Sequence, residues 1–182
     1  MSTPTLSIDF ATHRSRLAAL FRIVLAIPLV IVIYVYEIAT LVAVVIAWFA
    51  LLVTGRYPAA LYGFVSGFLR FYMRFACYFY LTTDAYPPIS GGEAPDYPVH
   101  VSVPERRESY SRLRVLLRIP YLIPLGVGVY VLLLLADIVA VIAWLAIVIT
   151  ARMPGFAGRY LEFAFGWLLR LEALALLLTQ SY

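Results

Sequence analysis

The chain has 182 residues, of which 64% are hydrophobic and only 13% are charged, and its formal net charge is +4. Soluble domains are about half apolar and about one quarter charged, so this composition, with a mean hydropathy of +0.92, excludes an ordinary soluble domain. We therefore predict an integral membrane protein. All 14 basic residues are arginine, and in such a chain we interpret them as topology and lipid-headgroup signals, not as a nucleic-acid surface.

Few residues in the chain carry reactive chemistry. Cys77 is the single cysteine, which excludes an intramolecular disulfide and a cysteine-based metal site. His13 and His100 each stand without a second histidine or a carboxylate at metal-ligand spacing. No catalytic triad, phosphate-binding glycine loop or cofactor motif can be assembled from the sequence. We expect no enzymatic activity, no cofactor, no metal site and no soluble small-molecule substrate.

The chain resembles itself at a spacing of 96 residues, without a gap. The matching segments include 15–17 with 111–113, 27–29 with 123–125, and 45–48 with 141–144. An ungapped match of this length predicts two copies of one unit. We place the copies at residues 1–88 and 109–182, and a polar linker rich in proline and glycine at 89–108.

Each copy contains one long apolar run, at residues 17–53 and 113–149. A run has 37 residues, which makes a straight helix of about 55 Å, whereas the hydrocarbon core of a bilayer is about 30 Å thick. We therefore predict that each run folds as a transmembrane helical hairpin, with its turn near residues 35–40 or 131–137. Two spans of roughly 17 residues reach the lower limit for crossing a bilayer.

Polar residues near the middle of each run support a turn there. Glu37 interrupts the first run and Asp137 the second, and a carboxylate costs about 2.5–3.5 kcal/mol at the bilayer centre but little among the headgroups. The alternative is a single long, tilted helix whose first turns lie in the interface. Pro28 and Pro124 would kink such a helix.

The arginines flank both runs, and this also favours hairpins. They are Arg14, Arg16, Arg22 and Arg56 in the first copy, and Arg112, Arg114, Arg118 and Arg152 in the second. A hairpin places both flanks of a run on one side of the membrane. Because arginine accumulates on the cytoplasmic side, we expect a multi-pass protein of the bacterial inner membrane with cytoplasmic N- and C-termini.

An aromatic, amphipathic stretch follows each run, at residues 59–83 and 155–179. Its basic residues fall on one helical face; they are Arg70 and Arg74 in the first copy, and Arg159 and Arg170 in the second. A helix with a narrow basic face and a broad apolar one is typical of the membrane interface. The alternative is a third, buried membrane helix whose arginines pair with acidic residues elsewhere.

Apolar and polar residues alternate in two short segments, which is the period of a β-strand. The apolar positions are Leu6, Ile8 and Phe10 near the N-terminus, and Val99, Val101 and Val103 in the linker. If a two-fold axis relates the copies, the two strands should pair antiparallel across it. We therefore predict a two-stranded cytoplasmic ribbon, which needs support from other elements because two strands alone are marginally stable.

Six arginines are candidates for contact with lipid headgroups or a partner, because guanidinium groups bind phosphate in bidentate fashion. They are Arg56, Arg70, Arg74, Arg152, Arg159 and Arg170. Asp84 is a candidate for structural pairing, with Arg56 or Arg74 of its own copy as the expected partner. The position equivalent to Asp84 in the second copy holds Gln180, so this pairing is expected in the first copy only.

Three motifs resemble a bacterial membrane family, domain of unknown function 4389, which often occurs in tandem. They are Arg-Leu-x-x-Leu-Phe-Arg with Ile-Pro at 16–28, Thr-Gly-Arg-Tyr-Pro at 54–58, and Leu-Thr-Thr-Asp-Ala-Tyr-Pro-Pro at 81–88. The resemblance extends over nearly the whole chain and implies an architecture, but no known activity. The second copy departs from the motif, with Ala151 in place of the glycine.

Taken together, the sequence predicts an all-α integral membrane protein of two tandem repeats. Each repeat has a transmembrane hairpin, an amphipathic interfacial helix and a short cytoplasmic strand. The expected function is that of a non-enzymatic accessory or scaffold subunit of a larger integral membrane protein complex, with anionic lipid bound at the cytoplasmic interface. The alternative is a stand-alone protein for lipid handling or small-solute transport.

Overall fold

Two short strands and six helices make up the computed structural model, which describes residues 3–11 and 13–179. The strands are β1 (Thr5–Ile8) and β2 (Val99–Ser102), and the helices are α1 (Arg16–Leu20), α2 (Arg22–Thr54), α3 (Ala59–Phe79), α4 (Arg112–Leu116), α5 (Arg118–Thr150) and α6 (Gly155–Ala175). Each helix of the first half has a counterpart of equal length 96 residues later.

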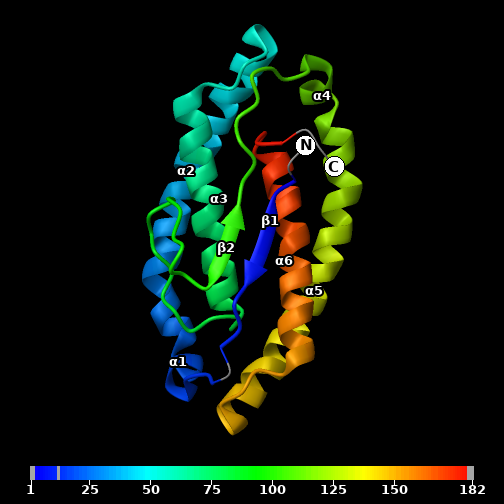
Figure 1. Ribbon diagram of the computed structural model, residues 1–182. Coiled ribbons are helices and arrows are strands. Elements are labelled where there is room, and N and C mark those ends of the chain that lie inside the picture. The colour runs from blue at the N-terminus through cyan, green and yellow to red at the C-terminus, as the bar shows by residue number, and fades with distance from the viewer. Residues whose placement is uncertain (1–2, 12, 180–182) are drawn as a thin grey trace.

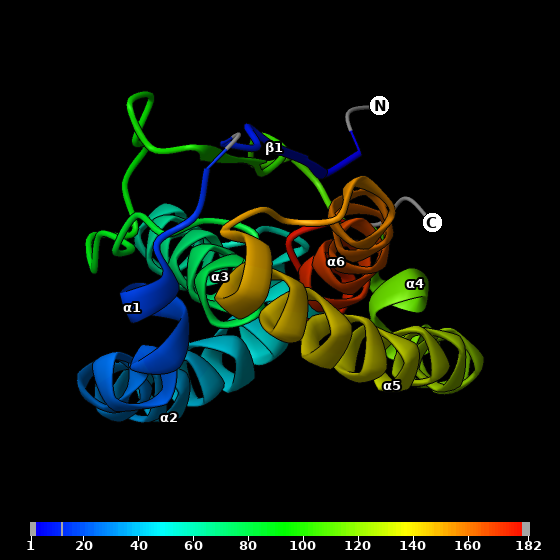
Figure 2. The same ribbon diagram turned by 90° about the horizontal axis from the view of Figure 1, so that it is seen from below.

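The elements form three layers (Figures 1 and 2). The strands lie on one side, α3 and α6 lie side by side in the middle, and α2 and α5 lie on the opposite side. α2 packs against α3, and α5 packs against α6. The two halves also exchange contacts, since α1 packs against α5 and α4 packs against α2. As the chain colours in Figure 1 show, α2 and α5 run in opposite directions.

Each long apolar run forms one helix, so the predicted hairpins over 17–53 and 113–149 are wrong. α2 and α5 are each 33 residues long and continue without a break through 35–40 and 131–137. Glycine and proline are the strongest signals for a turn, and neither predicted turn contains glycine or proline. A single carboxylate does not break a helix, because glutamate is a good helix former and an aspartate costs at most about 0.7 kcal/mol there.

The long helices end where the backbone turns left-handed. Gly55 has φ +70° and donates its amide hydrogen to the carbonyl of Leu51 at 2.9 Å. In the second half Ala151 adopts the same conformation, with φ +56°, and donates to Ile147 at 2.8 Å. Glycine adopts this conformation at no steric cost, so the second half keeps the helix end despite a less suitable residue.

The middle helices α3 and α6 are four residues shorter than the predicted stretches 59–83 and 155–179. The backbone turns left-handed just beyond them, at Leu81 with φ +65° and Leu177 with φ +66°. The amide of the next residue then bonds back to the helix, from Thr82 to the carbonyl of Cys77 at 3.0 Å and from Leu178 to that of Ala173 at 2.9 Å. This six-to-one bond is the Schellman motif, here formed with leucine instead of glycine.

The predicted antiparallel ribbon is confirmed, with Thr5 opposite Ser102 and Ile8 opposite Val99. The support that two strands need comes from the middle layer, since β1 packs on α6 and β2 on α3. Val99 and Val101 turn their side chains into the core, and the amide of Ile8 donates to Oε1 of Glu162 at 3.1 Å.

Small side chains on the inner faces of α2 and α5 allow close packing against the middle layer. They include Ala43 and Ala47 in α2, and Ala136 and Ala143 in α5, all buried. Large aliphatic residues cover the outer faces of both helices and are exposed. Both helices are long and apolar enough to cross a membrane.

We expect Ala47→Leu to lower the free energy of unfolding by about 1–3 kcal/mol, because Ala47 is fully buried and extra methyl groups would force its neighbours apart. Denaturation by sodium dodecyl sulfate in mixed micelles would measure this. The control is Val45→Leu on the exposed outer face, which should change stability by less than about 0.5 kcal/mol. Equal losses in the two variants would contradict the assigned helix faces.

Candidate functional site

Arginine from each half of the chain closes the end of the long helix of the other half. Nη2 of Arg16 donates to the carbonyl of Ile149 at 2.9 Å, and Nη2 of Arg112 donates to that of Val53 at 2.8 Å. The last carbonyls of a helix lack partners within it and carry the negative end of the helix dipole. Arg16 and Arg112, which flank the apolar runs, therefore stabilise these helix ends.

Backbone hydrogen bonds reinforce this exchange. The amide of Arg14 donates to the carbonyl of Ala151 at 2.9 Å, and the amide of Tyr110 donates to that of Gly55 at 2.8 Å. Each bond joins the segment before one long helix to the residue that ends the other. The start of each half is thus fastened to the end of the other half's long helix.

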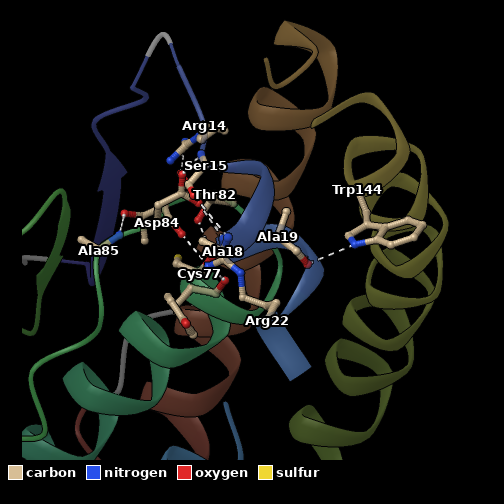
Figure 3. A network of polar contacts seen from close by, with 12 residues as sticks. Arg14, Ser15, Ala18, Ala19, Arg22, Cys77, Thr82, Asp84, Ala85 and Trp144 are labelled. Carbon is tan, nitrogen blue, oxygen red and sulfur yellow. Dashed lines mark hydrogen bonds and ion pairs between the residues drawn. The ribbon is translucent and has the colours of Figure 1, made fainter. Parts of the chain in front are cut away.

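A buried arginine, Arg22, organises the contacts at the start of α2 (Figure 3). Its side chain is 4% exposed and its Nη2 lies 2.6 Å from Oδ1 of Asp84. Nη1 donates to the carbonyls of Tyr78 and Thr83, each at 2.8 Å, and the guanidinium lies 4.3 Å from the centre of the Tyr78 ring. Arg22 therefore joins α2 to the end of α3 and the segment after it.

The expected pairing of Asp84 with Arg56 or Arg74 is wrong, because its partner is Arg22. Asp84 also accepts the amide hydrogen of Ser15 through Oδ2 at 2.8 Å, so the carboxylate ties the start of the chain's first helix to the end of α3. The partners are more than 60 residues apart in sequence, so local spacing could not identify them.

A second arginine supports the same contact region. The side chain of Arg14 donates a hydrogen bond to the carbonyl of Thr82 (Figure 3). Arg14 is buried, and burial is the main cause that lowers its pKa, while the charge of Asp84 opposes this shift. Arg14 and Arg22 therefore hold the segment after α3 from two sides.

The second half has different residues at two of the corresponding positions. Nη2 of Arg118, the counterpart of Arg22, donates to the carbonyl of Thr179 at 2.5 Å. The position of Arg14 holds Tyr110 there. Gln180, which replaces the aspartate, lies outside the described residues.

The two arginines of α3 lie beneath the linker. Nη1 of Arg70 is 3.4 Å from the carbonyl oxygen of Gly91, and Nη1 of Arg74 is 3.4 Å from that of Ser90. The linker approaches so closely at Gly91 that a Cβ there would collide with the backbone of Gly67. Gly67 therefore packs against the linker, and Arg74 is only 2% exposed.

A cavity of about 460 Å³ remains between the ribbon, the linker and Arg74. Its wall includes Thr5, Ser7, Glu93 and His100. Burial, and secondarily the neighbouring charge of Arg70, lowers the pKa of Arg74. The arginine side of α3 is thus covered, whereas the sequence predicts that it faces headgroups.

The arginines of α6, by contrast, line an open groove of about 400 Å³, which we call the α6 groove. Its residues are Leu6, Arg159, Glu162, Phe163, Gly166, Trp167 and Arg170. Arg159 and Arg170 are exposed, and the guanidinium of Arg170 lies 4.9 Å from the centre of the Trp167 ring. Two accessible cations with an aromatic surface between them form a suitable site for an anionic group.

The remaining candidate arginines, Arg56 and Arg152, lie just beyond the ends of the long helices and are exposed. Their backbone amides donate to Oγ1 of Thr54 at 3.2 Å and of Thr150 at 3.3 Å. They are separate from the α6 groove, so the structure does not unite the six candidate arginines in one site.

The two carboxylates that the sequence places at hairpin tips, Glu37 and Asp137, lie instead along the sides of continuous helices. Asp137 accepts a hydrogen bond from the hydroxyl of Tyr80 at 2.7 Å. Glu37 lines an apolar crevice of about 500 Å³ with Tyr34, Leu41 and Leu176. These side chains therefore need no turn in the chain to accommodate them.

A further carboxylate, Glu172 of α6, lies near Glu37. Burial, and next the negative charge of Glu37, raises the pKa of Glu172. Glu172 is not among the residues that the sequence singles out, since only the packing of α6 brings it near Glu37. No local pattern in the sequence could have found this pair.

Comparison with known proteins supports the resemblance for the first half of the chain. A family model described as a domain of unknown function (DUF4389) matches residues 16–90. The match includes α1, α2 and α3, the segment from Asp84 and the start of the linker. Neither the curated proteins nor the solved structures provide a match.

We expect Asp84→Asn to lower the free energy of unfolding by about 1.5–3 kcal/mol, because it weakens the hydrogen bond to the buried charge of Arg22. Denaturation in mixed micelles would measure the loss. Adding Arg22→Met should recover part of it, since no unpaired charge then remains. Glu93→Gln is the control, because Glu93 is exposed and its Oε1 lies 4.0 Å from Nη2 of Arg70; it should cost less than about 0.5 kcal/mol. A loss as large in the control would refute the assigned role of Asp84.

Glu172→Gln should stabilise the protein at alkaline pH but not at acidic pH. Because the pKa of Glu172 is raised, the folded state binds its proton more tightly than the unfolded state does. The stability that this proton contributes is therefore lost as the pH rises from the ordinary carboxyl range through the raised pKa. Unfolding at about pH 8 and about pH 4 would test this, with Glu93→Gln as the exposed control. A gain that does not depend on pH would contradict the prediction.

Proposed function

We propose that this chain, whose residues 16–90 match the DUF4389 family model, is a non-enzymatic accessory or scaffold subunit of a larger membrane protein complex and holds anionic lipid in the α6 groove. The observation that carries this proposal is the separation of surfaces in the three-layer fold. One side, formed by α2 and α5, exposes aliphatic residues along both helices. The opposite side carries the ribbon (Figure 2), and the exposed Arg159 and Arg170 of α6 line a groove there together with Leu6 of the ribbon.

The outer surface of α2 and α5 fits the acyl chains of lipids. Ile31 and Ile38 in α2 and Val127 and Ile138 in α5 are all more than half exposed. A soluble protein rarely exposes an apolar patch of more than a few hundred Å², and here the patch extends along two helices of 33 residues each. Burial of this surface in lipid would anchor the protein.

The α6 groove, on the ribbon side of α6, supports the binding of an anionic headgroup. Arg159 and Arg170 are exposed there. Gly166 between them leaves open space, since a Cβ added at this position would meet no atom within 4 Å. A lipid phosphate offers oxygens for bidentate guanidinium contacts. The equivalent region of α3 lies beneath the linker, so one groove per chain is proposed for lipid.

The surroundings of Cys77 and His100 fit a structural role. Cys77 is fully buried, and burial raises the pKa of its thiol to about 12, so the nucleophilic thiolate does not form near neutral pH. His100 is paired with Asp9 at 3.1 Å on the exposed surface of the ribbon. Among the described residues, no three metal-ligating side chains gather in one place.

A stand-alone lipid-handling protein is the second candidate function. The crevice of about 500 Å³ beside Glu37 and Tyr34 favours it, because its lining is mostly apolar and it opens next to α2. In that case a lipid chain would enter the crevice while its headgroup remains outside. Transport of a small solute is not favoured by any comparable feature of the described residues.

We expect that mild extraction of a tagged protein from native membranes retains anionic lipid, and that Arg159→Gln or Arg170→Gln lowers its amount several-fold. Arg114→Gln is a matched control, because it removes one exposed arginine outside the groove. Mass spectrometry of the co-purified lipids and proteins would measure both. Equal lipid retention in all variants would refute the groove, whereas a protein recovered alone with one lipid class would favour lipid handling over a scaffold role.

A further inference from the structure

We propose that α2 and α5 lie along the plane of the membrane, embedded in one leaflet, with the ribbon facing the water. This inference rests on the proposed membrane-embedded function and adds how the chain meets the bilayer. The occupant of the outer surface of α2 and α5 is then the acyl-chain region of a single leaflet. Four features of the fold carry the inference.

The position of the ribbon is the first feature. β1 and β2 lie beside the middle of the helices, not beyond their ends (Figure 1). If α2 and α5 stood upright across the bilayer, the ribbon would lie at the depth of the bilayer centre. Two strands with open edges have unpaired backbone groups, which the hydrocarbon region does not tolerate when they face lipid.

The charges around the ribbon are the second feature. Asp9 and His100 form an exposed pair on it, and Glu93 near it is also exposed. Arg159 and Arg170 are exposed on the neighbouring helix α6. Each charge at the bilayer centre costs about 2.5–3.5 kcal/mol or more. Helices that lie along the membrane place all of these groups on the water side.

The length of the apolar surface is the third feature. A helix of 33 residues extends about 50 Å, well beyond a hydrocarbon core of about 30 Å. The apolar exposure nevertheless reaches both ends, since Ile23 and Val53 are each 72% exposed. An upright helix would leave these ends outside the hydrocarbon, whereas a helix in the membrane plane buries its whole outer face.

The choice of side chains is the fourth feature, and it favours lipid over a protein partner. Helices that associate within membranes use small residues at their contact. Here Ala47 and Ala143 face inward and are buried. The outer face carries large residues such as Ile31, Ile38 and Phe49, which suit acyl chains.

This arrangement also accounts for the distribution of arginine. Residues before and after each long helix are rich in arginine, and a helix in the membrane plane has both ends on the same side. Continuous helices in the membrane plane therefore place the flanking arginines on one side of the membrane, just as hairpins would.

Single cysteines in a Cys77→Ala background would test the arrangement. Three sites are exposed and lie outside α2: His13 before α1, Ala60 at the start of α3, and Ser102 in the ribbon. The fourth site is Ile38, on the outer face of α2. Each variant is treated with a membrane-impermeant maleimide, in right-side-out and in inside-out vesicles made from native membranes. We expect positions 13, 60 and 102 all to react in one type of vesicle and not in the other. Position 38 should react in neither type.

The other outcomes overturn the inference in distinguishable ways. If positions 13 and 60 react from opposite sides, α2 spans the bilayer. If positions 13 and 60 react from one side and 38 from the other, α2 forms a hairpin. If alkaline carbonate removes the protein from the vesicles, the proposed membrane-embedded function itself fails, and the labelling pattern is then irrelevant. Far-UV circular dichroism of each purified variant checks that the helices are retained.

Discussion

The reciprocal capping of α2 and α5 is the interaction on which the remaining structure depends. Arg16 closes the end of α5 and Arg112 closes the end of α2, so each long helix ends against the other half of the chain. This exchange requires that the two helices run in opposite directions. It places α3 and α6 side by side between them and the ribbon, and it lets the strands meet antiparallel across the middle layer. Removal of either arginine would leave helix-end carbonyls without a partner.

The two halves share a framework but differ in what they expose. The linker belongs to neither helical unit, and it packs on α3 through the contact between Gly67 and Gly91. It covers Arg74, while Arg170 in the equivalent position of α6 remains open to the groove. One copy thus has a covered arginine and the other an accessible one. A single connecting segment is enough to give α3 and α6, which are equal in length, two different surfaces.

Much of the architecture follows from local pattern. Alternation of apolar residues located both strands, and the positions of α2, α3, α5 and α6 agree with the apolar and aromatic stretches to within about five residues. The hairpins failed for a physical reason. Glu37 and Asp137 were interpreted as turn residues because a carboxylate is costly in hydrocarbon. A helix instead accommodates such a residue at its side, where Asp137 meets the hydroxyl of Tyr80. The cost is reduced by the neighbour, not by a break in the helix.

The sequence alone determined the mostly helical class of the fold, the spacing of 96 residues and the location of the long elements, because composition and periodicity are properties of short stretches of chain. Only the tertiary structure decided that Asp84 pairs with Arg22, that Glu172 lies near Glu37, and which arginines are accessible. These facts depend on the path by which residues far apart in sequence come together. A charged side chain can bind a ligand only where no other segment of the chain covers it. A local sequence pattern does not show which side chains are covered in this way.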